Sequence, residues 1–124
     1  RRQRQMCIRD RSERSNIPIA RNKPVLGHGN FIRESGIGIN FVMNDPLVMF
    51  GTHPSLTGKV GEVVLGKKSG KASIIYKMGE LGMGALEDEK IGLILDEVKS
   101  TGIAKRDVLT NEEFTNIVAA VMSK

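Results

Sequence analysis

The chain has 124 residues, a net charge of +5, 40% hydrophobic and only 4% aromatic side chains, which is the composition of one small globular domain. This length excludes a complete (α/β) barrel of roughly 250 residues, and the apolar runs are shorter than the roughly 18 residues that cross a bilayer. The N-terminus lacks the apolar centre of a secretory signal, and the single cysteine, Cys7, can close no intramolecular disulfide. We therefore expect a cytoplasmic protein with no membrane partner.

The positive charge is concentrated near the N-terminus. Residues 1–23 contain eight basic and two acidic side chains, a net +6, and the other residues together carry −1. One hypothesis is therefore a small basic nucleic-acid-binding module. However, the segment Gln3–Arg11 resembles the translation of a sequencing adapter, and a charged terminal run of this kind is typical of a disordered arm. We predict that residues 1–12 are a disordered, artefactual basic tail and that the chain has no nucleic acid partner.

Residues 13–30 are predicted to form an extended linker, because two prolines fix φ and withhold donors while nearby glycines allow sharp reversals. Beyond the linker, apolar residues within 37–43 have approximately helical spacing. The Asn-Asp-Pro triplet at 44–46 supplies a stop, since a residue before proline avoids the α region. The sequence therefore predicts a helix over about 34–44 and a short turn over 47–50.

A strand is predicted over Lys59–Leu65, which is short, β-branched and bounded by glycines. A helical pattern of apolar residues follows over 72–81. A third helix is predicted over about 87–102, with three acidic residues in its first turn and a glycine C-cap at Gly102. The fourth, over about 110–121, begins with a capping box formed by Thr-Asn-Glu-Glu.

Together these elements predict the α/β fold class, with an α+β-like arrangement of the elements. It would consist of a short extended linker, one or two short strands and about four helices, without the catalytic (α/β) barrel. Residues 31–84 are expected to form one subdomain that contains a Ser-Gly-Lys loop, and residues 85–124 a C-terminal helical pair.

The loop after the predicted strand is a candidate anion site. Gly66 and Gly70 allow backbone N–H groups to converge at the start of the next helix, beside three lysines. The candidate anion-binding residues are Lys67, Lys68, Ser69, Gly70 and Lys71. The alternative, with equal weight, is a solvated lysine loop that caps the helix. No metal site is predicted, because neither His28 nor His53 has a carboxylate or cysteine at metal-ligand spacing.

Three stretches of the chain stand out together: Asn22–Gly27, Phe31–Gly38 and Val64–Ala72. In order and spacing they resemble the region that follows the catalytic barrel in the 2-isopropylmalate synthase and homocitrate synthase family. The resemblance implies an N-terminally truncated, C-terminal fragment of an acyltransferase that condenses acetyl-CoA with a 2-oxo acid, inactive alone. In this family the barrel binds a divalent metal and the 2-oxo acid, and the complete enzyme uses acetyl-CoA, so the fragment itself is expected to bind no cofactor. The implied partners are the missing N-terminal barrel and a second subunit of a homodimer.

The resemblance also implies catalytic residues. The family pattern in the second stretch is Phe-x-His-x-Ser-Gly-Ile-His, and its last histidine is expected to enter the active site of a partner subunit. Here Arg33 and Gly38 replace the two histidines, so the proton-transfer role cannot be carried over to Gly38. Either Glu34 or His53 takes that role, or Arg33 binds a carboxylate through its planar guanidinium. A surface arginine at a helix start is the alternative for Arg33.

The predicted helix over 34–44 is apolar on more than one face, unlike an ordinary surface helix. In a complete enzyme it would lie against the barrel or a partner subunit, so we expect it to be among the least buried of the apolar helices. A stand-alone dimerisation or regulatory domain is the remaining alternative for the function of the chain.

Overall fold

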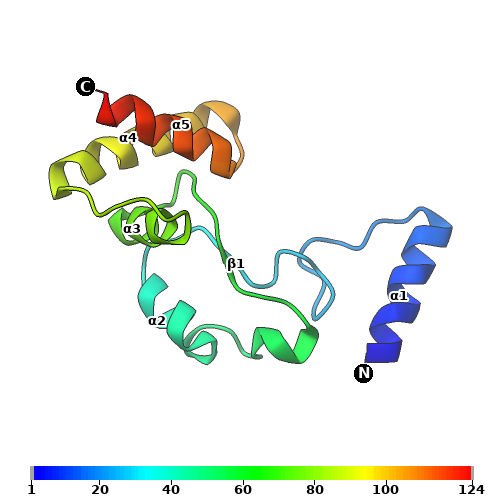
Figure 1. The fold of residues 1–124 in the computed structure, drawn as a ribbon. Coiled ribbons are helices and arrows are strands. Elements are labelled where there is room, and N and C mark those ends of the chain that lie inside the picture. The colour runs from blue at the N-terminus through cyan, green and yellow to red at the C-terminus, as the bar shows by residue number, and fades with distance from the viewer. Residues whose placement is uncertain (1, 124) are drawn as a thin grey trace.

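The computed structural model describes residues 2–123 and shows a mostly helical fold with one short sheet (Figure 1). Its elements in chain order are α1 (Arg2–Ser15), β1 (Ile32–Arg33), α2 (Ile39–Asn44), η1 (Pro46–Val48), η2 (Pro54–Thr57), β2 (Glu62–Val63), α3 (Lys71–Glu80), α4 (Asp88–Lys105) and α5 (Asn111–Met122). The strands are parallel, with Ile32 opposite Glu62 and Arg33 opposite Val63. The predicted fold class is confirmed: over the described residues the chain is mixed α/β, and it forms no barrel there.

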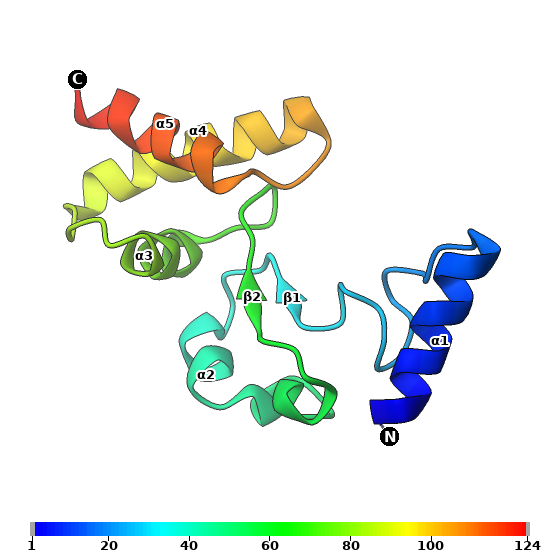
Figure 2. The ribbon, with the colours of Figure 1, turned by 45° about the vertical axis from the view of Figure 1, so that its right-hand side comes forward.

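The main apolar core lies among α3, α4 and α5, which pack together at one end of the molecule (Figures 1 and 2). On α4, the buried Ile91, Ile94 and Val98 recur every three or four residues, so one face of that helix is covered. The N–H of Leu109 donates to the Leu65 carbonyl at 2.8 Å and ties the segment after β2 to the helices. The buried core residues are Leu65, Ile74, Met78, Ile91, Ile94, Val98, Leu109, Phe114 and Val118.

A second group of buried apolar residues lies at or near the strands and α2: Leu26, Phe31, Ile39, Val42 and Val63. The rings of Phe31 and Phe50 meet edge to face, with centroids 5.3 Å apart. This contact ties the chain before β1 to the turn after η1.

The predicted helix over 34–44 is wrong in its first part, because α2 begins only at Ile39. Glu34 to Gly36 are neither helix nor strand, and Gly38 has a φ of +68°, a left-handed conformation that suits glycine. The extended part lies against the loop over 66–70, and that tertiary contact overrides the apolar periodicity. The predicted turn is confirmed by η1, with Pro46 at its first position.

Residues 2–15 form α1, which corrects the prediction of a disordered tail over 1–12; residue 1 lies outside the described residues. Arginine, glutamine and methionine are good helix formers, and the Arg14 side chain donates to Asp10 one turn earlier at 2.9 Å. In both views α1 lies to one side, away from α3, α4 and α5 (Figures 1 and 2). Local propensity rather than core packing therefore accounts for this helix.

The three C-terminal helices occur where they are predicted. The capping box is confirmed: the Thr110 N–H donates to Glu113 at 2.7 Å, and the Glu113 N–H donates to the Thr110 hydroxyl at 3.2 Å. The predicted C-cap at Gly102 is wrong, since α4 continues to Lys105 and is capped by Arg106. Gly102 lies buried inside the helix, where the loop over 66–70 approaches its backbone.

The prediction for segment 37–43 is confirmed only in part. Ile37 and Phe41 are 77% and 71% exposed, whereas Ile39 and Val42 are each 1% exposed. One face of the segment packs against the rest of the chain, and the other face is uncovered.

Candidate functional site

Glu34 follows β1 directly and lies over the loop that connects β2 to α3. Its Oε1 accepts the backbone N–H of Lys68 at 2.9 Å. The Ser69 hydroxyl accepts the Gly66 N–H at 2.9 Å and donates to the Glu34 carbonyl at 3.4 Å. Glu34 is therefore held against the loop at two points, its carboxylate by the Lys68 N–H and its main-chain carbonyl by the Ser69 hydroxyl.

Glycines make this close approach possible. A Cβ at Gly36 would lie 2.8 Å from the Gly70 Cα, and a Cβ at Gly66 would lie 2.7 Å from the Glu34 Oε1. On the other side of the loop, a Cβ at Gly102 would lie 3.1 Å from the Lys67 nitrogen. The loop is thus packed between the segment after β1 and the last turns of α4, and at Gly36, where the nearest atoms are backbone, a side chain would force the loop to move.

This packing changes the interpretation of the candidate anion loop. The N–H groups of Gly66, Lys68 and Gly70 point to acceptors within the protein, namely Ser69, Glu34 and Ser73. A carboxylate of the chain itself therefore occupies part of the position predicted for an external anion.

The side chains of the same loop differ in their surroundings. Lys71 forms an ion pair with Asp88 at 2.6 Å, and Ser69 is buried. Of the five predicted anion-binding residues, Lys67 and Lys68 line the cavity that includes Glu34. Helix capping and internal bonding account for Ser69 and Gly70.

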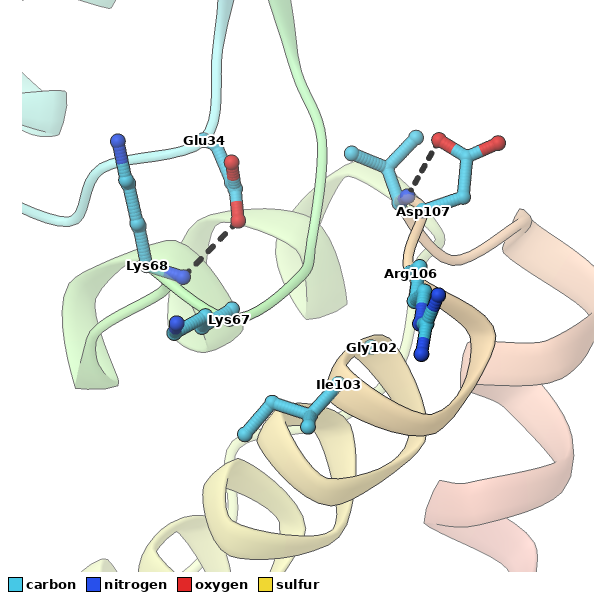
Figure 3. A pocket seen from close by; sticks show the side chains of 8 residues that line it. Glu34, Lys67, Lys68, Gly102, Ile103, Arg106 and Asp107 are labelled. Atoms are coloured by element: carbon cyan, nitrogen blue, oxygen red, sulfur yellow. Dashed lines mark hydrogen bonds between the residues drawn. The ribbon is translucent and has the colours of Figure 1, made fainter.

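That cavity has a volume of about 400 Å³ and lies between the loop and the turn that joins α4 to α5 (Figure 3). Its lining residues are Glu34, Lys67, Lys68, Gly102, Ile103, Arg106, Asp107 and Val108. Figure 3 shows the two lysines on the loop side and Arg106 on the α4 side. The structure therefore brings Glu34, a predicted catalytic residue, together with Lys67 and Lys68 of the predicted anion loop, and adds Arg106.

Arg33 lies in β1 and is not among the lining residues of this cavity. One guanidinium nitrogen, Nη2, donates to the Ile37 carbonyl at 2.7 Å, across the turn before α2. Its Nε is buried and has no hydrogen-bond acceptor among the described residues. The Arg33 guanidinium is thus held beside the turn at residues 37–38, just before α2.

His53 is also separate from the Glu34 cavity and lines a different one together with Met43 and Lys59. It is the N-cap of η2: its Nδ1 accepts the Ser55 N–H at 3.3 Å and lies 2.7 Å from the Ser55 hydroxyl. A structural capping role therefore accounts for its position.

Sequence reasoning missed two charged residues. Arg106 has a φ of 59°, at a helix end where glycine is usual, so the sequence pattern gave no signal for it. Lys77 is only 5% exposed; its Nζ donates to the Val63 carbonyl at 3.2 Å and to Glu80 at 2.9 Å. The signal for Lys77 was its place on the apolar face of α3, between Ile74 and Met78.

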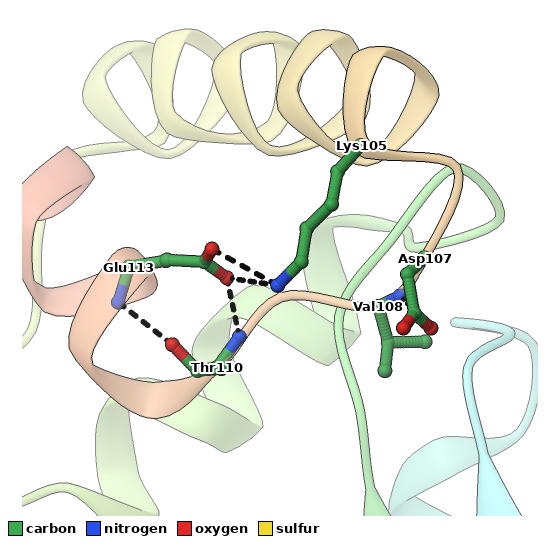
Figure 4. A network of polar contacts seen from close by, with 5 residues as sticks. All are labelled: Lys105, Asp107, Val108, Thr110 and Glu113. Atoms are coloured by element: carbon green, nitrogen blue, oxygen red, sulfur yellow. Dashed lines mark hydrogen bonds and ion pairs between the residues drawn. The ribbon is translucent and has the colours of Figure 1, made fainter.

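A polar network links the ends of α4 and α5 (Figure 4). The Lys105 Nζ donates to both carboxylate oxygens of Glu113, at 2.9 and 2.8 Å, and the Thr110 N–H donates to one of them. The Lys105 hydrogen bond, followed by the Thr110 backbone bond, lowers the pKa of Glu113 below its usual range.

Two further groups have shifted pKa values. Burial, helped by the charge of Arg9, lowers the pKa of Lys59, whose Nζ donates to the Gly27 carbonyl and lies 6.0 Å from the centre of the Phe31 ring. Burial and then the charge of Glu80 raise the pKa of Tyr76. Neither group lines the cavity around Glu34, so both shifts reflect structural packing.

Over residues 2–123, no group of three or more His, Cys, Asp or Glu side chains is placed to hold a metal ion. None of the helices in that range is both long and apolar enough to cross a membrane.

Comparison with known proteins identifies relatives of one kind, although no family model matches the chain. A protein of Ignicoccus hospitalis named "Probable 2-isopropylmalate synthase" is 34% identical over 91% of this chain. "Homocitrate synthase AksA" of Methanopyrus kandleri is 32% identical over 90%, and "2-isopropylmalate synthase 2" of Caldanaerobacter subterraneus is 29% identical over 89%. In each case the chain spans 28% of the length of its relative.

Proposed function

Because the chain belongs to the family of isopropylmalate and homocitrate synthases, we propose that it is the subdomain following the catalytic barrel of an acyltransferase. The complete enzyme would condense acetyl-CoA with a 2-oxo acid, in the cytoplasm and as a homodimer. The chain alone would not catalyse the reaction. Support comes from the matched length, which is nearly all of this chain and little more than a quarter of its relatives.

The observation that carries the proposal is an uncovered apolar surface on the segment between β1 and β2. Its exposed apolar side chains are Ile37, Phe41, Leu47, Val48, Met49, Leu56 and Val60. Isolated domains seldom leave so many large apolar side chains of one segment in water. We propose that this surface packs against the barrel or the partner subunit in the complete enzyme.

The chain fits the role of a supporting subdomain and does not fit that of a metal centre. A divalent metal requires several oxygen or nitrogen donors in one place, and residues 2–123 contain no such cluster. In the complete enzyme the barrel would supply the metal and acetyl-CoA sites, as is expected for this family, and no catalytic step is assigned to a metal here.

The segment Arg33–Gly38 would carry this chain's contribution to the reaction. Arg33 is held by the Ile37 carbonyl, and Glu34 by the Lys68 N–H, so both side chains are fixed by contacts within the chain, and the segment that carries them leads to the exposed Ile37. We assign Arg33 the role of binding a substrate carboxylate and Glu34 that of orienting or exchanging a proton. His53, which caps η2, is the weaker candidate.

A chimera tests the proposal. Residues 13–124 would replace the matching part of the Ignicoccus hospitalis relative, and release of free CoA from acetyl-CoA would be measured with pyruvate, 2-oxoisovalerate and 2-oxoglutarate. We expect turnover by the chimera with one of these acids, and background rates for the relative without its matched part and for the 124-residue chain. Turnover by the 124-residue chain alone would contradict the proposal.

A matched pair of substitutions tests the interface. Phe41→Asp should abolish turnover by the chimera, because it places a charge in the apolar contact, whereas Leu93→Asp on the exposed face of α4 should have little effect. Equal activity of the two variants would place the contact elsewhere.

A further inference from the structure

The cavity between the loop over 66–70 and the turn after α4 has an excess of positive charge. Three of its lining residues are cations, Lys67, Lys68 and Arg106, and two are carboxylates, Glu34 and Asp107. We propose that this cavity binds a small organic phosphate, with the three cations holding the phosphate groups. The site is independent of the proposed function, since it requires neither a barrel nor a second subunit.

The two carboxylates are already engaged by backbone donors. Glu34 accepts the Lys68 N–H at 2.9 Å, and Asp107 accepts the Val108 N–H at 2.8 Å (Figure 3). In contrast, none of the ion pairs formed within residues 2–123 includes Lys67, Lys68 or Arg106. These three cations therefore have no ion-pair partner among the described residues, and against the two carboxylates they leave a positive excess that favours an anionic ligand.

The backbone of Arg106 supplies an independent argument. It ends α4 in the left-handed conformation, with φ 59° and ψ 27°, where glycine would be less strained than any residue with a Cβ. Non-glycine residues that are held in this conformation are found preferentially at functional sites. At this position the strain places a guanidinium at the cavity, and a planar guanidinium matches the paired oxygens of a phosphate.

The rest of the lining sets the size and polarity of the ligand. Gly102, Ile103 and Val108 form an apolar wall, and Ile103 is 56% exposed, so it can cover an apolar part of a ligand. A volume of about 400 Å³ is within the range of small-molecule sites. These features favour a phosphate ester with an organic group over free inorganic phosphate.

Calorimetric titration of the complete chain tests the site at low ionic strength. The probes are ADP, inorganic pyrophosphate and, as an organic dianion without phosphate, malonate. We expect ADP to bind more tightly than pyrophosphate, and malonate not to bind detectably. Because a hydrogen bond to a charged group contributes about 1.5–3 kcal/mol, Arg106→Gly or Lys67→Gln should each weaken ADP binding on the order of tenfold or more.

Lys99→Gln is the matched control, because Lys99 is also on α4 but does not line the cavity. It should leave the ADP affinity unchanged. Arg106→Gly should also keep or raise the melting temperature, since it relieves the left-handed strain, and this measurement shows that a loss of binding is not a loss of folding. The proposal is overturned if ADP fails to bind at millimolar concentration, if malonate binds as well as ADP, or if Arg106→Gly binds ADP like the unmodified chain.

Discussion

Replacing Gly36 with alanine would test the contact that builds the site. A Cβ at Gly36 would lie 2.8 Å from the Cα and 2.9 Å from the nitrogen of Gly70, and 3.3 Å from the Ser73 hydroxyl. Two of these atoms belong to the backbone, so the loop must move rather than a flexible side chain. Overpacking of this kind costs about 1–3 kcal/mol, and the movement also weakens the bond from Lys68 to Glu34, which contributes about 1–3 kcal/mol. We expect the free energy of unfolding of Gly36→Ala to be lower by about 2–4 kcal/mol.

Urea unfolding followed by circular dichroism measures this loss, with the slope m as a check that the same surface is exposed. Gly92→Ala is the matched control: no heavy atom of the described residues lies within 4 Å of a Cβ at Gly92, which is inside α4. Alanine should stabilise the chain there by about 0.5–1 kcal/mol, because it is the better helix former. If Gly36→Ala unfolds within about 0.5 kcal/mol of the unmodified chain, the two segments are not in the close contact that the argument requires.

Two further predictions concern ion pairs. Glu80→Ala should lower the free energy of unfolding, measured in urea, more than Lys77→Met does. Without Glu80 the buried Lys77 ammonium keeps only the Val63 carbonyl as an acceptor, whereas without the Lys77 ammonium water can solvate the half-exposed Glu80. The reverse order would contradict this prediction. The pKa of Glu113 is lowered on folding, so its stabilising effect is complete above the usual range of a glutamate pKa and is lost as the pH falls through the lowered value. Glu113→Gln should therefore be less stable than the unmodified chain at neutral pH, and a difference that persists undiminished at pH 2 would refute this.

The parts of the fold that depend on local signals were predictable from the sequence. The capping box at Thr110 predicted the start of α5 because the two hydrogen bonds form within four residues. Pro46 predicted the turn after α2 for a similar reason, since its fixed φ acts on its own neighbours.

The errors arose where a distant segment decides the conformation. The apolar spacing of 37–43 suggested a longer helix, but Gly36 lies against Gly70, more than thirty residues later, and stays extended. Gly102 was predicted to end α4, but it lies inside the helix, and the absence of a side chain there allows Gly66 to pack against the helix. In both cases a glycine marked a close approach between backbones, which sequence alone does not distinguish from a turn or a cap.

The candidate site was predictable in composition but not in arrangement. Glu34 was identified through the family resemblance, and the lysine loop through its glycines and lysines before a helix start. Their mutual bond was not, since it joins residues 34 positions apart. Because Glu34 accepts the Lys68 N–H, that backbone group is not free to bind an external anion. The positive charge of the cavity comes instead from the side chains of Lys67, Lys68 and Arg106, and Arg106 lies at the end of a helix that no sequence motif connects to the loop.

The uncovered apolar surface and the basic cavity lie on different parts of the molecule, which makes the two proposals separable. The apolar side chains belong to the segment 37–60, on α2, η1 and η2, whereas the cavity is formed by the loop over 66–70 and the end of α4. In Figure 2 these parts lie on opposite sides of the strand pair. Glu34 lies between them, because it follows β1 and bonds to the loop. A partner that covers the apolar surface would therefore leave the cavity open, and the two parts are joined by β2 and by the bond from Lys68 to Glu34.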